Sequence, residues 1–205
     1  MIIEPKIFEG FNRILTGVVV PRPIAFVSTV SDTGIVNIAP YSFFNAISYD
    51  PPLLIFSSSK YTSGGKLKDS LANIEQNGEF VINVVVEDIL EAMNMTAAEY
   101  PQNVSEFDIA GLTPIESHLI KPPRLKESPV NIECKLERII TLGDKSHPHG
   151  LVIGEILLLH IDDTIISSEG INHQKLKPVG RLAGNSYCTT SNAFELTRPS
   201  LKDER

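Results

Sequence analysis

Hydrophobic and polar residues alternate most regularly between residues 130 and 142. Apolar side chains at every second position are typical of a strand that is buried on one face. The residues expected to share one face are Val130, Ile132, Cys134, Leu136, Arg138, Ile140 and Leu142. After a loop at 143–150, an apolar run at 151–161 predicts a second long strand, antiparallel to the first.

Shorter strands are predicted in the N-terminal half of the chain. Their expected ranges are 24–30, 35–39, 53–58 and 80–86. A turn signal at 31–34 makes the first two a hairpin, and Pro40 is expected to end the second strand. Residues 41–46 follow as a polar and aromatic segment for which no element is predicted.

Helical periodicity is limited to short stretches. Apolar residues at positions i, i+4 and i+7 predict a helix over about 66–77, which Gly78 ends. Asp88 is expected to cap a second, short helix. So few helices disfavour a parallel, doubly wound sheet.

These patterns predict one domain over residues 1–205, mainly β with a few helices, built as an antiparallel barrel or sandwich. Residues 100–129 are rich in proline and weakly periodic. A segment of this length without clear elements is expected to be a lid, an arm or part of a subunit contact.

Charge and hydropathy narrow the set of partners. The 205 residues include 18 basic and 25 acidic ones, which gives a net charge of -7. A nucleic-acid-binding face is basic, so this balance argues against nucleic acid. No apolar run is long enough to predict a membrane span, and the first residues lack a signal-peptide pattern. We therefore expect a cytoplasmic protein that does not bind a membrane.

The turn from Ser57 to Lys66 is the main candidate for ligand binding. It follows an apolar run, contains several hydroxyls and two glycines, and leads into the predicted helix. Hydroxyls, backbone N–H groups and a helix start together suit a phosphate. The alternative is an ordinary solvated turn, because serine-rich loops are common.

Other catalytic patterns are absent from the sequence. It has no dinucleotide fingerprint, no Walker phosphate loop, no nucleophile elbow and no zinc-protease helix motif. His147 and His149 lie in a polar loop without a nearby cluster of Cys or carboxylates, so no metal site is expected. Cys134 and Cys188 are expected to be reduced thiols.

Several short motifs occur in a fixed order between about residues 18 and 190. They include Arg22-Pro23-Ile24-Ala25-Phe26-Val27-Ser28-Thr29, Asn37-Ile38-Ala39-Pro40-Tyr41-Ser42-Phe43-Phe44-Asn45, Asp50-Pro51-Pro52, Ser57-Ser58-Ser59, Lys68-Asp69-Ser70 and Pro178-Val179-Gly180-Arg181-Leu182. Each motif is weak alone, but their order and spacing resemble the flavin reductase-like family.

The resemblance implies an FMN-binding split β-barrel, an antiparallel barrel of Greek-key type. Such a protein is similar to flavoredoxin and to the reductase components of two-component monooxygenases. It is usually a homodimer with the flavin near the subunit interface. FMN is then the implied cofactor, NAD(P)H the reductant, and a monooxygenase or another redox protein the partner. No catalytic side chain is expected, because the flavin carries the chemistry.

The resemblance also implies a set of cofactor-binding residues. Residues along the flavin ring and ribityl chain would be Ser28, Thr29, Ser42, Phe43, Phe44 and Asn45. Residues holding the phosphate would be Ser57, Ser59, Lys66 and Ser70, and Arg22 completes the set. The alternatives are that the two phenylalanines belong to the core and that Arg22 and Arg181 pair with carboxylates.

Three functions stay open from the sequence. The first is an NAD(P)H-dependent flavin oxidoreductase that passes reduced flavin or electrons to an acceptor. The second is a non-enzymatic FMN electron carrier, and the third is a dimeric binding scaffold without flavin. No nicotinamide motif is visible to separate the first two.

Overall fold

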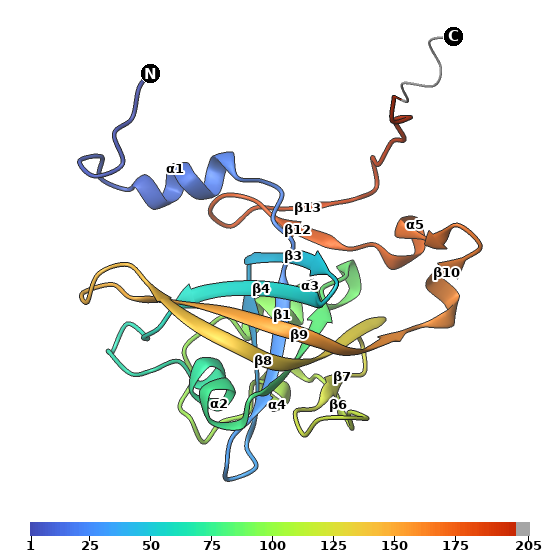
Figure 1. The fold of residues 1–205 in the computed structure, drawn as a ribbon, viewed down its shortest axis with the longest axis horizontal. Helices are drawn as coiled ribbons and strands as arrows, with labels where there is room; N and C mark the ends of the chain where they lie inside the picture. The colour runs from blue at the N-terminus through green and yellow to red at the C-terminus, as the bar shows by residue number, and fades with distance from the viewer. Residues whose placement is uncertain (200–205) are drawn as a thin grey trace.

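A computed structural model describes residues 1–199 of the chain. Its main feature is a seven-stranded sheet in which every neighbouring pair is antiparallel. The strands are β1 (Ala25–Val30), β2 (Val36–Tyr41), β3 (Phe43–Tyr49), β4 (Pro52–Ser59), β5 (Glu79–Val84), β8 (Val130–Leu142) and β9 (His149–Ile161). The two long strands, β8 and β9, cross the whole molecule as a single hairpin (Figure 1).

The order of the strands explains how the sheet curls. It runs β2-β1-β5-β8-β9-β4-β3, so the two edge strands are consecutive in the chain and only Ser42 separates them. The edges must therefore lie close together, and the sheet bends round into a barrel. Register shifts at Glu133/Cys134 and Leu136/Arg138 help the β8–β9 hairpin to bend, because a bulge increases local twist. The predicted antiparallel barrel is confirmed.

Strand β1 lies between two layers of apolar side chains. Phe26 packs in one cluster with Ile38 and Phe107, whereas Val27 packs in the other with Phe56. Neighbouring side chains of the strand point to opposite sides, as in any strand, and both of its faces are buried. Close packing extends to Gly154 on β9, where an added Cβ would overlap the ring of Phe80.

The main correction concerns residues 40–49. Pro40 does not end the second strand, because β2 continues to Tyr41 and β3 begins at Phe43. Proline is tolerated there because β2 is an edge strand that pairs only with β1, and its missing N–H costs no ladder bond. Strand β9 also begins within the predicted loop, at His149.

The helices are short and lie around the barrel (Figure 1). They are α1 (Phe11–Val18), α2 (Asp69–Asn77), α3 (Leu90–Met95), α4 (Glu106–Ala110) and α5 (His173–Leu176). Helix α2 begins later than predicted, because Lys68 is still extended and bonds back to Lys60. Gly78 ends it in the left-handed region, with φ of 70°, as predicted. The predicted cap at Asp88 is wrong: Asp88 lies inside a 3-10 turn and makes no capping bond.

The proline-rich segment 100–129 packs onto the barrel. It contains α4 and two short strands, β6 (Pro114–Ile115) and β7 (Arg124–Leu125). The side chains of Phe107 and Leu125 are completely buried in one apolar cluster. The segment therefore contributes to the core and is neither a lid nor an arm; the third expectation, part of a subunit contact, stays a prediction.

The C-terminal part begins after β9 with the short strands β10 (Ile166–Ser167) and β11 (Gly170–Ile171). After α5, strands β12 (Val179–Arg181) and β13 (Tyr187–Thr189) form a small hairpin. Backbone hydrogen bonds in both directions join Arg181 to Arg22, just before β1. The two ends of the chain are thereby brought to the same side of the barrel (Figure 1).

One buried carboxylate attaches segment 100–129 to the long hairpin. Glu133 of β8 is fully buried and accepts hydrogen bonds from the backbone N–H groups of His118 and Leu119, at 2.7 and 2.8 Å. His160 Nε2 of β9 lies 2.6 Å from the same carboxylate. Burial alone would raise the pKa of Glu133, but these hydrogen bonds hold it below its usual value.

We expect Glu133→Gln to lower the free energy of unfolding by about 3 kcal/mol at pH 7, since it breaks a buried charged network. Because the folded-state pKa lies below the unfolded value, the carboxylate stabilises the protein above about pH 4.5 and less as pH falls through the folded pKa. Urea unfolding between pH 3 and 7 measures both effects. Identical pH dependence in the variant and the wild type would contradict this account.

Candidate functional site

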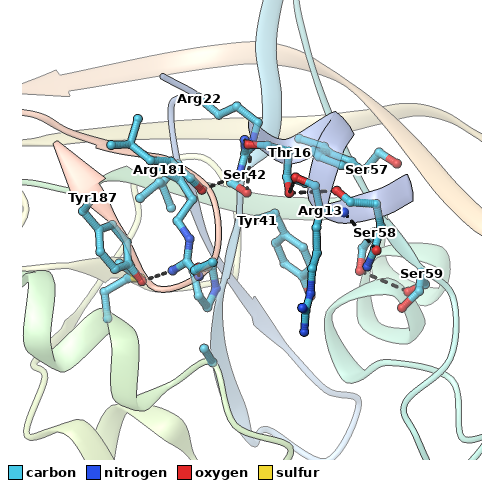
Figure 2. A pocket seen from close by; sticks show the side chains of 18 of the residues that line it. Arg13, Thr16, Arg22, Tyr41, Ser42, Ser57, Ser58, Ser59, Arg181 and Tyr187 are labelled. Atoms are coloured by element: carbon cyan, nitrogen blue, oxygen red, sulfur yellow. Dashed lines mark hydrogen bonds between the residues drawn. The ribbon is translucent and has the colours of Figure 1, made fainter. Parts of the chain in front are cut away.

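The largest cavity near the predicted ligand-binding residues has a volume of about 490 Å³. It lies where the two edge strands meet, between α1, the end of β4 and the β12–β13 hairpin (Figure 2). Small-molecule sites commonly have volumes of about 300–1,000 Å³. Its lining includes Asn12, Arg13, Thr16, Arg22, Ile24, Tyr41, Ser42, Phe43, Ser57, Ser58, Ser59, Met93, His149, Arg181 and Tyr187.

The charge of the lining is one-sided. Arg13, Arg22 and Arg181 all line the cavity, and none of the lining residues in the described part of the chain is Asp or Glu. This contrasts with the net charge of -7 for the whole chain. A concave surface of one sign concentrates ligands of the opposite sign, so the cavity suits an anion.

Arg22 is the most constrained of the three arginines. Its side chain is largely buried, and its Nη1 donates to the carbonyl oxygens of Thr16 and Val19, at 2.6 and 2.8 Å. Nη2 donates to the carbonyl of Leu182 at 3.0 Å, and Nε lies 3.4 Å from the hydroxyl of Ser42. Burial, and then the nearby Arg181, lower its pKa. No carboxylate within residues 1–199 of the same chain pairs with Arg22, so the predicted alternative of an ion pair within the barrel rim is not observed.

Arg181 forms a second wall of the cavity. Its guanidinium donates to the hydroxyl of Tyr187 and to the carbonyl of Gly184, and lies 4.4 Å from the centre of the Tyr187 ring. The Tyr187 hydroxyl in turn donates to Asn94 at 3.0 Å. These contacts connect the C-terminal hairpin to helix α3, which contains Asn94.

The end of β4 supplies hydroxyls on the opposite side. Ser58 and Ser59 use their hydroxyls for backbone carbonyls, those of Ser59 and Tyr61 respectively. The hydroxyl of Ser57 has no hydrogen-bond partner in the described part of the chain. Arg13 extends from α1 into the space between Tyr41 and these serines (Figure 2). A phosphate could be held by hydroxyls and a guanidinium placed in this way.

A smaller cavity of about 110 Å³ shares Tyr41 with the first one. Burial raises the pKa of Tyr41 to about 12. Lys68 lines this side cavity with its Nζ 6.0 Å from the Tyr41 ring, and burial lowers its pKa. Asp69, Glu99 and Glu106 also line it, so the side cavity is acidic overall.

The structure brings five predicted site residues into the main cavity: Arg22, Ser42, Phe43, Ser57 and Ser59. They come from the turn before β1, from the β2–β3 corner and from the end of β4. Phe43 is partly exposed and faces the cavity 5.9 Å from the Arg22 guanidinium, whereas Phe44 packs against the core. Of the two phenylalanines, Phe44 packs against the core, as the alternative predicted, and Phe43 does not.

Ser28, Thr29 and Ser70 do not line the main cavity, although Ser70 lines the smaller one. All three are buried in the barrel wall. Ser28 donates to the carbonyl of Pro123, at 2.5 Å, whereas Thr29 and Ser70 both bond to Asn37, at 3.3 and 2.8 Å. These side chains satisfy one another and hold neighbouring segments together, which is the usual role of buried hydroxyls.

Asn45 and Lys66 are exposed on the surface and outside the lining of either cavity. The Asn45 side chain accepts a bond from the next backbone N–H, that of Ala46. The lysine that reaches a cavity is Lys68, two residues further along.

The sequence patterns above predict no helix at residues 11–18, so they do not place α1 at the cavity. Asn12, Arg13 and Thr16 line the cavity from this helix. The pattern Phe11, Ile14, Leu15, Val18 follows helical spacing and would have predicted an amphipathic helix with Arg13 beside its apolar stripe.

Comparison with known proteins identifies the same family that the sequence motifs resemble. The model of the family described as "Flavin reductase like domain" matches residues 17–175. The chain belongs to this family. The site described above lies largely within the matched region, and only the Arg181–Tyr187 wall and α1's first residues fall outside it.

Solved structures of similar proteins share the fold. Nitrilotriacetate monooxygenase component B from Bacillus cereus is 39% identical with a TM-score of 0.89, over 96% of this chain and 98% of that one. The 2-nitrobenzoate 2-nitroreductase NbaA from Pseudomonas fluorescens is 33% identical with a TM-score of 0.86, over 98% of both chains. The barrel is thus the split barrel of the flavin reductases.

A relative in sequence has a named redox role. The reductase subunit HsaB of a flavin-dependent monooxygenase from Rhodococcus jostii is 30% identical over 155 residues, which is 75% of this chain and 68% of that protein. The described residues 1–199 contain no helix long and apolar enough to cross a membrane. They also contain no group of three or more His, Cys, Asp or Glu placed to hold a metal.

We expect Arg22→Met to lower the free energy of unfolding by about 2–3 kcal/mol, because three carbonyl oxygens lose a charged donor. Chemical unfolding at pH 7 measures this loss. Arg138→Met is the matched control, since Arg138 is mostly exposed and pairs only with its neighbour Glu137. Equal stability of the two variants would show that Arg22 does not hold these segments.

Proposed function

We propose that this protein is an FMN-dependent oxidoreductase, in which NAD(P)H reduces a flavin held in the main cavity. The reduced flavin or its electrons then pass to an acceptor. The observation that carries the proposal is a cavity that residues 1–199 line with three arginines, a row of serines and no carboxylate, in a chain of the flavin reductase-like family. FMN joins a phosphate to a large ring system, and the cavity offers groups for both.

The residues fit the two ends of such a ligand. Ser57 and Arg13 would hold the phosphate, by hydroxyl and charged hydrogen bonds. Phe43, Ile24 and Met93 offer apolar contact for the ring, on the side of the cavity that Arg22 closes. Bound flavin supplies hydride acceptance and electron transfer, chemistry that no side chain of the protein can perform.

The protein's own contribution would be positioning and charge. Arg22 is held by three carbonyls before any ligand binds, so its positive charge is already fixed in the cavity wall. Fixed charges of this kind stabilise negative charge that accumulates on a bound group without costly rearrangement. Arg181 adds a second fixed charge on the neighbouring wall.

We also propose that the protein is a homodimer. The free edge of β3 carries exposed apolar side chains at Phe43, Ile47 and Tyr49. An exposed edge strand with such side chains is typical of a surface that another chain covers. Because Phe43 also lines the cavity, a second copy placed there would lie beside the flavin.

The named activities of the relatives suggest two ways of using the flavin. A monooxygenase component would release reduced flavin to an oxygenase partner, whereas a nitroreductase would keep it and reduce an organic substrate directly. A carrier protein would keep its flavin and show no turnover with NAD(P)H. Gel filtration of the flavin-loaded protein after reduction separates release from retention.

We expect purified protein to bind FMN with quenching of flavin fluorescence, and to oxidise NADH or NADPH faster than free FMN does. The measurement is absorbance at the nicotinamide band with and without protein. Tight FMN binding without oxidation of either nicotinamide would exclude the reductase and favour the carrier. Absence of FMN binding would favour the scaffold without flavin.

We expect Ser57→Ala to weaken FMN binding about tenfold and riboflavin binding much less, because only FMN carries the phosphate. Lys66→Ala is the comparison variant. The family resemblance predicts a similar selective loss for Lys66, whereas its exposed position outside the cavity lining predicts almost none. Fluorescence titration of both variants with both flavins decides between the two lysine predictions, and equal losses for both flavins would remove Ser57 from the phosphate site.

A further inference from the structure

Helix α1 lies against the cavity without being packed into the protein. None of its eight residues is buried, and apolar Leu15 and Val18 are 38% and 71% exposed. A helix of this length is marginal in water, so its stability must come from tertiary contacts. The structure therefore shows a helix that is placed over a site but weakly attached there.

Its attachment is concentrated at the C-terminal end. The Arg22 guanidinium holds the carbonyls of Thr16 and Val19, and Gly17 lies close to Ala183. The N-terminal end begins at Gly10 in the left-handed region, with no side-chain capping bond. The bonds of the Arg13 N–H are local, to Gly10 and Asn12. The first turn can therefore move while the last turn stays fixed.

Arg13 is the group that links this first turn to the cavity. Its side chain extends between Tyr41 and the serine end of β4 (Figure 2). Within residues 1–199 its guanidinium makes no hydrogen bond or ion pair, and no carboxylate lines the cavity. A guanidinium binds a phosphate through two parallel hydrogen bonds, which is stronger than a bond to a neutral group.

We propose that Arg13 supplies the charged contact, beside the Ser57 hydroxyl, that distinguishes a phosphorylated flavin from riboflavin, and that its pairing with the phosphate docks the first turn of α1 over the cavity. The inference rests on the proposed flavin-binding function. It adds that the ligand holds α1 over the cavity as a strap. Arg22 fixes the C-terminal end of this helix, and the phosphate, through Arg13, fixes its N-terminal end. Part of the binding free energy is then used to order α1.

Hydrogen exchange of the α1 amides tests the strap directly. In full-length wild-type protein we expect fast exchange without ligand and with saturating riboflavin, and exchange at least about tenfold slower with saturating FMN. Trypsin gives a second measure, because it cleaves after Arg13 and FMN alone should protect that bond. Slow exchange without ligand would overturn the proposal, since α1 would then already be docked, for example on a second copy.

Variants at Arg13 test the recognition. We expect Arg13→Gln to weaken FMN binding about tenfold or more, to leave riboflavin binding unchanged and to abolish the slowed exchange. Arg13→Lys should recover part of both effects because it restores the charge. Arg138→Gln is the matched control. It makes the same charge change at an exposed position of β8 outside the cavity lining, and this variant should behave as wild type.

The outcomes separate this inference from the function on which it rests. Wild-type protein that binds neither flavin would overturn both. Protein that binds FMN and riboflavin with equal slowing of α1 exchange, or an Arg13→Gln variant that loses both flavins equally, would overturn the role of Arg13 and leave the flavin site standing.

Discussion

A guanidinium removed from water needs hydrogen-bond partners inside the protein. The partners of Arg22 hold together the segments that form the cavity. Arg22 is only 6% exposed and bonds to the backbone at Thr16, Val19 and Leu182. One side chain thereby joins the N-terminal helix, the entry to β1 and the C-terminal hairpin. Because no carboxylate in the described residues neutralises it, its charge stays directed at the cavity. The shape and the electrostatics of the site thus depend on the same group.

The position of the cavity follows from the way the barrel closes. Strands β2 and β3 are the two edges of one sheet and are joined at Ser42, so the corner between them is where the barrel leaves a seam. The chain's two ends cover this seam with α1 and the β12–β13 hairpin, and each brings an arginine. An acidic protein acquires a locally basic cavity in this way, which favours an anionic ligand.

A sequence motif does not tell which way a side chain points, so it does not tell which of its residues reach the cavity. Ser28 and Thr29 belong to the family motif, yet alternation along β1 and its central position bury both. Conversely, Ser57 and Ser42 line the cavity because they lie where strands end and the backbone turns toward the seam. Arg13 lies outside every motif that was recognised, and only the placement of α1 brings it to the site.

Local periodicity in the sequence determined the strands β1, β4, β5, β8 and β9 and the end of α2 at Gly78, because these depend on residues close together in the chain. The order and spacing of the motifs determined the family. Only the tertiary structure decided which groups meet in the cavity, since the bond from Arg22 to Leu182 spans 160 residues. Electrostatic interactions fall with distance in space and not with separation along the chain. The turn from Ser57 to Lys66, a candidate phosphate site in the sequence, is therefore divided by the fold: its serine end faces the arginines, and Lys66 lies outside the cavity.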